Sequence, residues 1–96
     1  MAMTKAYTYI VACADSTYYT GWTTDITARV AAHNAKIGAR YTRSRIPVQL
    51  VYWEEYDDKQ SAQRREVAIK KMTRAQKEQL VRGFDIEKQP TQDQEG

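Results

Sequence analysis

The sequence predicts an α+β fold in which helices flank a small three-stranded antiparallel sheet, in the order β-β-α-β-α-α. The 96 residues are enough for one hydrophobic core and leave little room for a second domain. Three segments are rich in aromatic and β-branched residues, and three others have capping residues followed by helical spacing of apolar residues. Because three strands are too few to close a barrel, the helices are expected to cover the sheet.

The first two strands are expected at residues 7–13 and 17–23, joined as a hairpin by a three-residue turn. This loop length pairs Tyr9 with Gly21 and makes Tyr9 and Tyr19 diagonal neighbours on one face of the sheet. Gly21 would then leave an open space opposite Tyr9, where a ligand or another backbone could approach closely. Tyrosine is an ordinary strand residue, but seven tyrosines against one phenylalanine favour a use for the hydroxyl groups.

A helix and a basic connector are expected next. Asp25 offers an N-cap for a helix from about 26 to 36, and Gly38 is expected to end that helix. Residues 39–46 then form a short, strongly basic connector that ends at Pro47.

The remaining part of the domain is predicted to contain one strand and two helices. Residues 48–56 have the composition of a third strand, and Asp58 can cap a helix that continues to about Met72. A capping-box pattern at residues 73–76 begins the last helix, which Gly83 is expected to end.

The charge is distributed unevenly along the chain. A folded domain is expected over residues 1–84, followed by a disordered acidic tail over residues 85–96. Of the net charge of +3, residues 83–96 contribute −3, so residues 1–82 carry +6. Many of the basic residues lie between positions 25 and 45. Such a surface is either a solvated face that keeps the protein soluble or a binding site for a polyanion.

Composition excludes several classes of protein. The mean hydropathy is −0.76, and no apolar run approaches the roughly 20 residues of a membrane-spanning helix. The first residues lack the pattern of a secretory signal, which makes a cytoplasmic location the expectation. The single cysteine, Cys13, excludes an internal disulfide and a thiolate zinc site.

Arg29 and His33 are the first candidate functional residues. They lie four residues apart on the first predicted helix and therefore share a face, beside the apolar stripe of Ile26, Val30 and Ile37. Both side chains could reach one phosphate group. The alternative is that Arg29 extends along the protein surface and that His33 is an ordinary structural histidine.

Glu66 is the most unusual residue of the second predicted helix. It lies four residues after Ala62 and three residues before Ile69, within the apolar stripe of that helix. An unpaired buried carboxylate is costly, so Glu66 is expected to have a cationic partner or to coordinate a metal ion. Lys70, four residues further on, offers a simple ion pair as the alternative.

Several motifs occur together in a fixed order: Tyr7-Thr8-Tyr9, Tyr19-Thr20-Gly21, Arg29 with His33-Asn34, Gly38-Ala39-Arg40-Tyr41-Thr42-Arg43, and Arg65-Glu66 with Lys70. Their joint spacing, over about residues 6–82, resembles the GIY-YIG nuclease superfamily. It is most similar to the small stand-alone bacterial, YhbQ-like branch. Both name-giving triplets depart from the pattern, since Tyr7-Thr8 replaces Gly-Ile and Thr20 replaces Ile. Trp22 also stands where a smaller aliphatic residue is more familiar.

The resemblance implies a metal-dependent endonuclease that hydrolyses DNA phosphodiester bonds, as in DNA repair. Structure rather than sequence of the DNA is expected to select the cut site, because phosphate contacts do not specify a base. Glu66 would hold the divalent metal ion, Mg²⁺ or Mn²⁺.

The resemblance also implies roles for individual residues. Tyr9 or Tyr19 would activate or position water, and Arg29 would hold the scissile phosphate. The expected catalytic residues are Tyr9, Tyr19, Arg29, His33, Glu66 and Lys70. The connector residues expected on the DNA backbone are Arg40, Tyr41, Arg43 and Arg45.

Two other interpretations belong to different functional classes. One is a nucleic-acid-binding module that keeps the fold and the basic surface but cuts poorly, and that needs a partner protein. The other is a purely structural domain, against which the position of Glu66 in an apolar stripe speaks.

Overall fold

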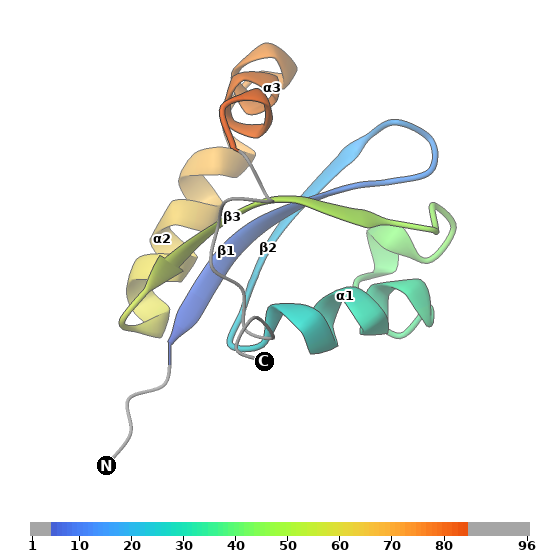
Figure 1. Cartoon of the computed structure of the whole chain (residues 1–96), viewed down its shortest axis with the longest axis horizontal. Coiled ribbons are helices and arrows are strands. Elements are labelled where there is room, and N and C mark those ends of the chain that lie inside the picture. Colours follow the sequence, from blue (N-terminus) through green and yellow to red (C-terminus); the bar gives the residue numbers. More distant parts are fainter. Residues whose placement is uncertain (1–4, 85–96) are drawn as a thin grey trace.

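The computed structural model describes residues 5–84, and the expected acidic tail lies outside them. The element order is β-β-α-β-α-α, as predicted, and the antiparallel sheet has the strand order β2-β1-β3 (Figure 1). The elements are β1 (Ala6–Ala12), β2 (Tyr18–Thr23), α1 (Ile26–Asn34), a short 3₁₀ turn (Arg40–Thr42), β3 (Gln49–Tyr56), α2 (Lys59–Lys70) and α3 (Arg74–Arg82).

The central strand β1 is buried on both faces of the sheet. Tyr9 and Val11 belong to the core cluster that packs against Val30 of α1. The neighbouring Thr8 faces the other way and donates a hydrogen bond to the Ala62 carbonyl oxygen of α2 at 2.7 Å. The two helices therefore cover opposite faces of the sheet, as expected from the alternation of side chains along a strand.

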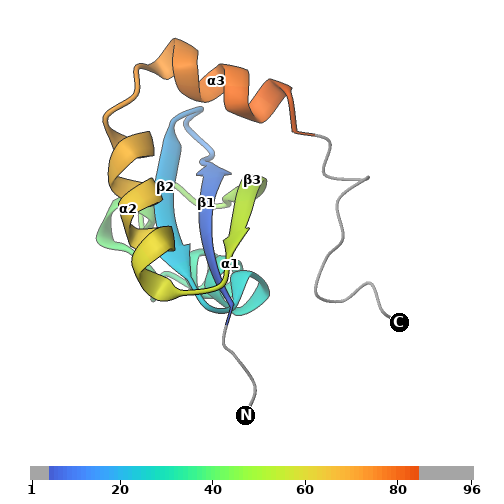
Figure 2. The ribbon, with the colours of Figure 1, turned by 90° about the vertical axis from the view of Figure 1, so that its left-hand side faces the viewer.

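Helix α3 lies across one end of the sheet, beside the turn of the β1–β2 hairpin (Figure 2). Arg74 at the start of α3 donates a hydrogen bond to the Ser16 carbonyl oxygen in that turn at 2.7 Å. Its guanidinium carbon also lies 4.3 Å from the centre of the Tyr18 ring. No helix within residues 5–84 is long and apolar enough to cross a membrane.

The hairpin has the predicted register. Tyr9 is opposite Gly21, Val11 is opposite Tyr19, and the Cys13 amide donates to the Thr17 carbonyl oxygen at 2.8 Å. The prediction of an open space at Gly21 is wrong, however. The Tyr9 ring fills it, because a Cβ atom at position 21 would lie only 2.7 Å from Tyr9 Oη.

Helix α1 ends earlier than predicted. Its last residue is Asn34, and Lys36 takes the left-handed conformation with φ of 67°. The Asn34 side chain forms two hydrogen bonds with the backbone of Val48. Its Oδ1 accepts from the Val48 amide at 2.7 Å, and its Nδ2 donates to the Val48 carbonyl oxygen at 3.2 Å. Ile37 is consequently 74% exposed and is not part of the apolar stripe. Gly38 therefore does not terminate the helix.

The remaining helix boundaries follow local sequence signals. The Asp25 and Asp58 side chains accept the capping hydrogen bonds of α1 and α2, at 3.1 and 2.7 Å. The capping box at residues 73–76 is present, and Gly83 is the C-cap of α3.

Candidate active site

The centre of the site is a buried hydrogen bond between Tyr9 of β1 and His33 of α1. The two side chains are 1% and 0% exposed, and Tyr9 Oη lies 2.8 Å from His33 Nε2. Packing of α1 on one face of the sheet brings the last turn of the helix over the middle of the central strand. The glycine opposite Tyr9 on β2 leaves the room that the tyrosine ring occupies.

A second hydrogen bond fixes the proton on the His33 ring. His33 Nδ1 lies 2.8 Å from Thr42 Oγ1, and this hydroxyl donates its proton to the Ala39 carbonyl oxygen at 3.0 Å. We assign the ring proton to Nδ1 from these two shorter hydrogen bonds, so that Thr42 Oγ1 accepts from Nδ1–H, since a hydroxyl has one proton to donate. The Ala39 amide points its N–H at Nδ1 from the longer distance of 3.4 Å, a contact that the tautomer with the proton on Nδ1 leaves unused. This tautomer leaves Nε2 as the acceptor for the Tyr9 hydroxyl.

Arg29, on the same helix, contacts the Tyr9 oxygen. Its Nε donates to Tyr9 Oη at 3.4 Å. Burial raises the pKa of Tyr9 to about 12, although the Arg29 hydrogen bond and charge act in the opposite direction. Burial, followed by the Arg29 charge, lowers the pKa of His33. At neutral pH, Tyr9 is consequently a phenol beside a neutral imidazole that can accept its proton.

Tyr19 lies beside this pair, as the hairpin register predicts. Its ring centre is 6.5 Å from that of Tyr9 and 5.3 Å from that of His33. On another side it stacks on Tyr41 of the connector, with centres 5.9 Å apart and planes 25° apart. The Arg45 guanidinium in turn lies 3.9 Å from the Tyr41 ring centre. Tyr19 is thus held among three rings.

Glu66 and Lys70 border the site from α2. Lys70 Nζ lies 3.1 Å from Glu66 Oε2 and 6.0 Å from the Tyr19 ring centre. The Glu66 side chain is 18% exposed, between the buried Ala62 and Ile69. Its charge also adds slightly to the raised pKa of Tyr9. The ion pair with Lys70, the simpler of the two interpretations, is therefore present at the edge of the site.

The donor set around Glu66 can be compared with the needs of a divalent cation. Within residues 5–84, no three His, Cys, Asp or Glu side chains gather as a metal site. Mg²⁺, however, is commonly held by one or two carboxylates together with waters and substrate phosphates. Lys70 contacts Oε2 of Glu66, which leaves Oε1 for such a ligand role. A one-carboxylate site of this kind fits the residues present.

The basic connector packs against Tyr19 and His33 of the site, and its arginines are of two kinds. Arg40 and Arg43 are exposed. Arg45 instead pairs with Asp15 of the hairpin turn at 3.0 Å and donates to the Tyr41 carbonyl oxygen at 2.8 Å. Of the four connector residues predicted to contact the DNA backbone, Arg40, Tyr41 and Arg43 are therefore exposed, whereas Arg45 also stabilises the connector itself.

Thr42 and Gly38 also shape the site, a role that the sequence did not predict for either residue. Thr42 is fully buried and orients His33, and a Cβ atom at Gly38 would lie 2.6 Å from His33 Nδ1. Both residues belong to the motif Gly38-Ala39-Arg40-Tyr41-Thr42-Arg43, and this motif is the sequence feature that could have indicated their importance. Their contacts could not be deduced, because a connector without periodic structure gives no register against the helix.

Comparisons with known proteins match most of the chain. The family model of the GIY-YIG catalytic domain matches residues 5–79. A UPF0213 protein of Halobacterium salinarum is 55% identical over 74 residues, which cover 77% of this chain and 96% of the relative. Another, of Clostridium perfringens, is 49% identical over 83 residues, covering 86% and 89%. The solution NMR structure of a UPF0213 protein from Bacillus halodurans is similar with a TM-score of 0.53 and 42% identity, over 81% of this chain and 83% of that one.

Proposed function

Because this chain belongs to the GIY-YIG catalytic domain family, a nuclease superfamily, as a relative of the small UPF0213 proteins, we propose that it is a metal-dependent DNA endonuclease. Its reaction is the hydrolysis of phosphodiester bonds, and the structure of the DNA selects the cut site. The observation that carries the proposal is the buried hydrogen bond between Tyr9 and His33, with Arg29 on the tyrosine oxygen.

The proposed mechanism moves one proton through this hydrogen bond. Tyr9 Oη takes a proton from the attacking water while its own proton passes to His33 Nε2, so that His33 is the final base. The water oxygen forms a bond to phosphorus, and the bond to the leaving oxygen breaks. The leaving oxygen keeps the electron pair of that bond and takes up a proton from solvent. Arg29, whose Nε already contacts Tyr9 Oη, is placed to stabilise the charge that develops on the tyrosine and on the phosphate.

Glu66 is the residue that would hold a divalent cation, Mg²⁺ or Mn²⁺. When bound, the cation supplies charge neutralisation at the phosphate. Lys70 pairs with Glu66 and lies near Tyr19, so it can take over a phosphate contact when the carboxylate binds a cation. Tyr19 packs against His33 and holds the catalytic rings in position.

A second candidate function, a nucleic-acid-binding module with little cleavage, is favoured by the Lys70–Glu66 ion pair. That pair occupies one carboxylate oxygen of the single acid in the site. A partner protein would then supply or activate cleavage.

Cleavage of branched, nicked and duplex DNA with Mn²⁺, with and without chelator, tests the proposal. Glu66→Gln should abolish metal-dependent cleavage and leave the fold intact. Glu78→Gln is the matched control, because Glu78 forms the same type of i,i+4 pair, with Arg74 at 3.0 Å in α3. Cleavage by Glu66→Gln at the rate of the unaltered protein would refute the mechanism. DNA binding without cleavage by the unaltered protein would favour the binding module.

A further inference from the structure

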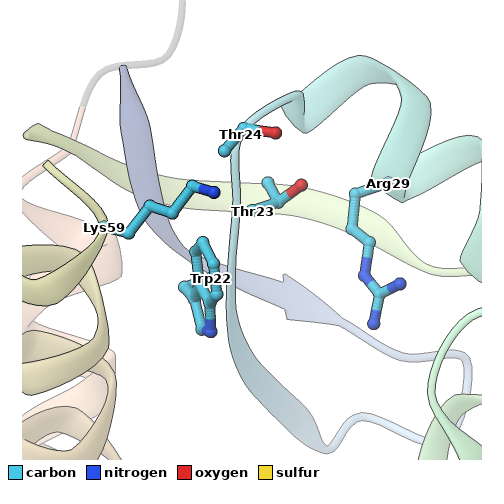
Figure 3. A pocket seen from close by; sticks show the side chains of 5 residues that line it. All are labelled: Trp22, Thr23, Thr24, Arg29 and Lys59. Carbon is cyan, nitrogen blue, oxygen red and sulfur yellow. The ribbon is translucent and has the colours of Figure 1, made fainter. Parts of the chain in front are cut away.

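An open pocket lies beside the candidate active site, and the mechanism above leaves most of it unused. Its volume is about 390 Å³, and it is lined by Trp22, Thr23, Thr24, Arg29 and Lys59 (Figure 3). This volume is within the range of ligand sites, roughly 300–1,000 Å³. Because the pocket is open on one side, it suits a segment of a polymer better than an enclosed small molecule.

Arg29 joins this pocket to the catalytic residues. Its side chain lines the pocket, and its Nε also donates to Tyr9 Oη at 3.4 Å. A group bound in the pocket is therefore a direct neighbour of the phosphate that Arg29 is proposed to hold. In a nucleic acid, that neighbour is the next nucleotide of the same strand.

The charge of the pocket favours a phosphate. Arg29 of α1 and Lys59 of α2 project from opposite sides of β2, and no carboxylate is among the lining residues (Figure 3). The nearest acids in the chain, Asp25 and Asp58, do not line the pocket and accept the capping hydrogen bonds of the two helices. Lys59 itself is exposed and makes no ion pair within residues 5–84. Each of the two cations can attract one phosphate of a nucleic-acid strand.

Trp22 gives the pocket a surface for a nucleobase. It lies on the edge strand β2, and its half-buried side chain is on the same side of β2 as Lys59, with Arg29 across the strand (Figure 3). Aromatic side chains interleaved with cations are the usual means of binding single-stranded nucleic acid, because every base can stack on them. A base inside an intact duplex already stacks on its neighbours and is not available to Trp22.

We propose that this pocket binds an unpaired nucleotide of the DNA substrate, with its base stacked on Trp22 and its phosphate beside Lys59. The inference rests on the proposed function and deepens it, because it names DNA with an unpaired nucleotide next to the cut as the substrate. Arg29 then holds the scissile phosphate at the boundary between the pocket and the catalytic residues.

Tryptophan fluorescence provides a direct test in metal-free buffer, where binding is measured without cleavage. The chain has two tryptophans, so Trp53→Phe leaves Trp22 as the only one. DNA with an unpaired nucleotide should quench Trp22 emission at saturation, and blunt duplex should leave it nearly unchanged. Equal quenching by both DNAs, or none by either, would overturn the proposal. If Trp53→Phe does not fold, the difference between the unaltered protein and Trp22→Phe gives the same measurement.

Binding to labelled DNA tests the two side chains separately. Trp22→Leu should weaken binding of DNA with an unpaired nucleotide by roughly fivefold or more and change duplex binding little. Lys59→Gln should weaken the same complex and lower the slope of log affinity against log salt by about 0.7. Arg64→Gln is the control, because Arg64 is an exposed cation on the same helix about 140° around from Lys59. An unchanged affinity in both pocket variants would contradict the inference.

The outcomes distinguish this inference from the proposed function. Cleavage that is indifferent to Trp22→Leu and to unpaired nucleotides would overturn the pocket assignment and leave the nuclease. Quenching and selective binding without cleavage would support the pocket and overturn the nuclease. Failure to bind any DNA would overturn both.

Discussion

His33 can act as a proton acceptor only if its proton resides on Nδ1, and a single buried hydroxyl decides this. Thr42 Oγ1 accepts from Nδ1 because its own proton is bound to the Ala39 carbonyl oxygen. Thr42 touches no candidate substrate group, so it is a positioning residue. The same side chain also satisfies a buried donor and thereby contributes to stability.

Thr42→Val should remove this orientation while keeping the shape of the side chain. An unpaired Nδ1–H costs about 1–3 kcal/mol of folding free energy, and the opposite tautomer then becomes accessible. We expect the single-turnover cleavage rate to fall roughly tenfold or more, with a shifted pH profile. Thr42→Ser keeps the hydroxyl and should retain the cleavage rate and the pH profile of the unaltered protein. An unaltered rate and pH profile in Thr42→Val would show that the hydroxyl does not position His33.

Stability should also depend on pH through His33, the only histidine of the chain. Burial lowers the pKa of His33 in the folded state, so the unfolded chain binds the proton first as the pH falls. The contribution to stability is full above about pH 6.5, the unfolded value, and is lost as the pH falls towards the depressed folded pKa.

Thermal unfolding between pH 5 and pH 7.5 measures this effect, with the pH values chosen about the unfolded pKa. The Tm of the unaltered protein should decrease towards the acidic end. His33→Asn should have a lower Tm but a flatter dependence on pH in this window. Parallel curves for the two proteins would contradict the assignment of the titration to His33.

At the scale of the elements, a carboxylate on β3 connects the sheet to α2. Glu54 accepts hydrogen bonds from Tyr52 and Tyr56 of its own strand and from Arg65 of α2, the last at 2.9 Å. Burial alone would raise the pKa of Glu54, but these hydrogen bonds outweigh it and lower the pKa. The side chains of Glu54 and Arg65 are 19% and 32% exposed, so solvent screens the pair only in part.

Glu54→Gln should therefore destabilise the fold by about 1–3 kcal/mol. The effect should be largest near neutral pH and should shrink below about pH 4.3, where the unfolded carboxyl becomes protonated. Glu55→Gln is the control, because Glu55 is the next residue of the strand and forms an exposed pair with Lys5 at 3.4 Å. Denaturant unfolding of both variants checks the expectation, and equal losses of stability would contradict it.

Elements defined by local signals were predicted well from the sequence. The loop length set the hairpin register, and the aspartate and threonine caps set the starts of three helices. The predicted end of α1 was wrong because the Asn34 side chain bonds to the backbone of Val48, a contact between distant parts of the chain. In the site, the register predicted that Tyr9 and Tyr19 are neighbours, and helical spacing predicted that Arg29 and His33 share a face. The Tyr9–His33 hydrogen bond and the connector contacts of Thr42 needed the tertiary structure.

At the scale of the whole molecule, exposed cations lie around a site whose proposed proton-transfer groups, Tyr9 and His33, are buried. Arg40 and Arg43 lie exposed on the connector, and Lys59 lies at the start of α2. Among the arginines of residues 5–84, Arg29 alone donates a hydrogen bond to Tyr9. Binding and bond breaking should therefore depend on different cations.

Replacing Arg40 and Arg43 with Gln should weaken DNA binding and flatten its salt dependence, by up to about 0.9 in slope for each duplex phosphate that the variant no longer neutralises. Saturating DNA should restore turnover in this double variant. Arg45 is left in place because it pairs with Asp15 in the fold. The measurements are DNA affinity at several salt concentrations and the rate at saturation.

Arg29→Ala is the counterpart and should behave in the opposite way. We expect affinity within a few fold and a single-turnover rate lower by roughly 10² or more, because a charge clamp acts mainly in the transition state. A variant of Arg29 with reduced affinity alone, or a connector variant with a reduced rate alone, would reverse these assignments.

The burial of Tyr9 and His33 has a consequence for how such proteins evolve. Side chains that are 1% and 0% exposed and bonded to each other are selected for folding, in addition to the catalytic role proposed for them. A lineage that gave up cleavage would still retain both, because their replacement would damage the core. Drift after loss of activity would instead show first at accessible positions such as Arg40 and Arg43. Those positions, rather than the buried pair, are where divergence among descendants would record a change of function.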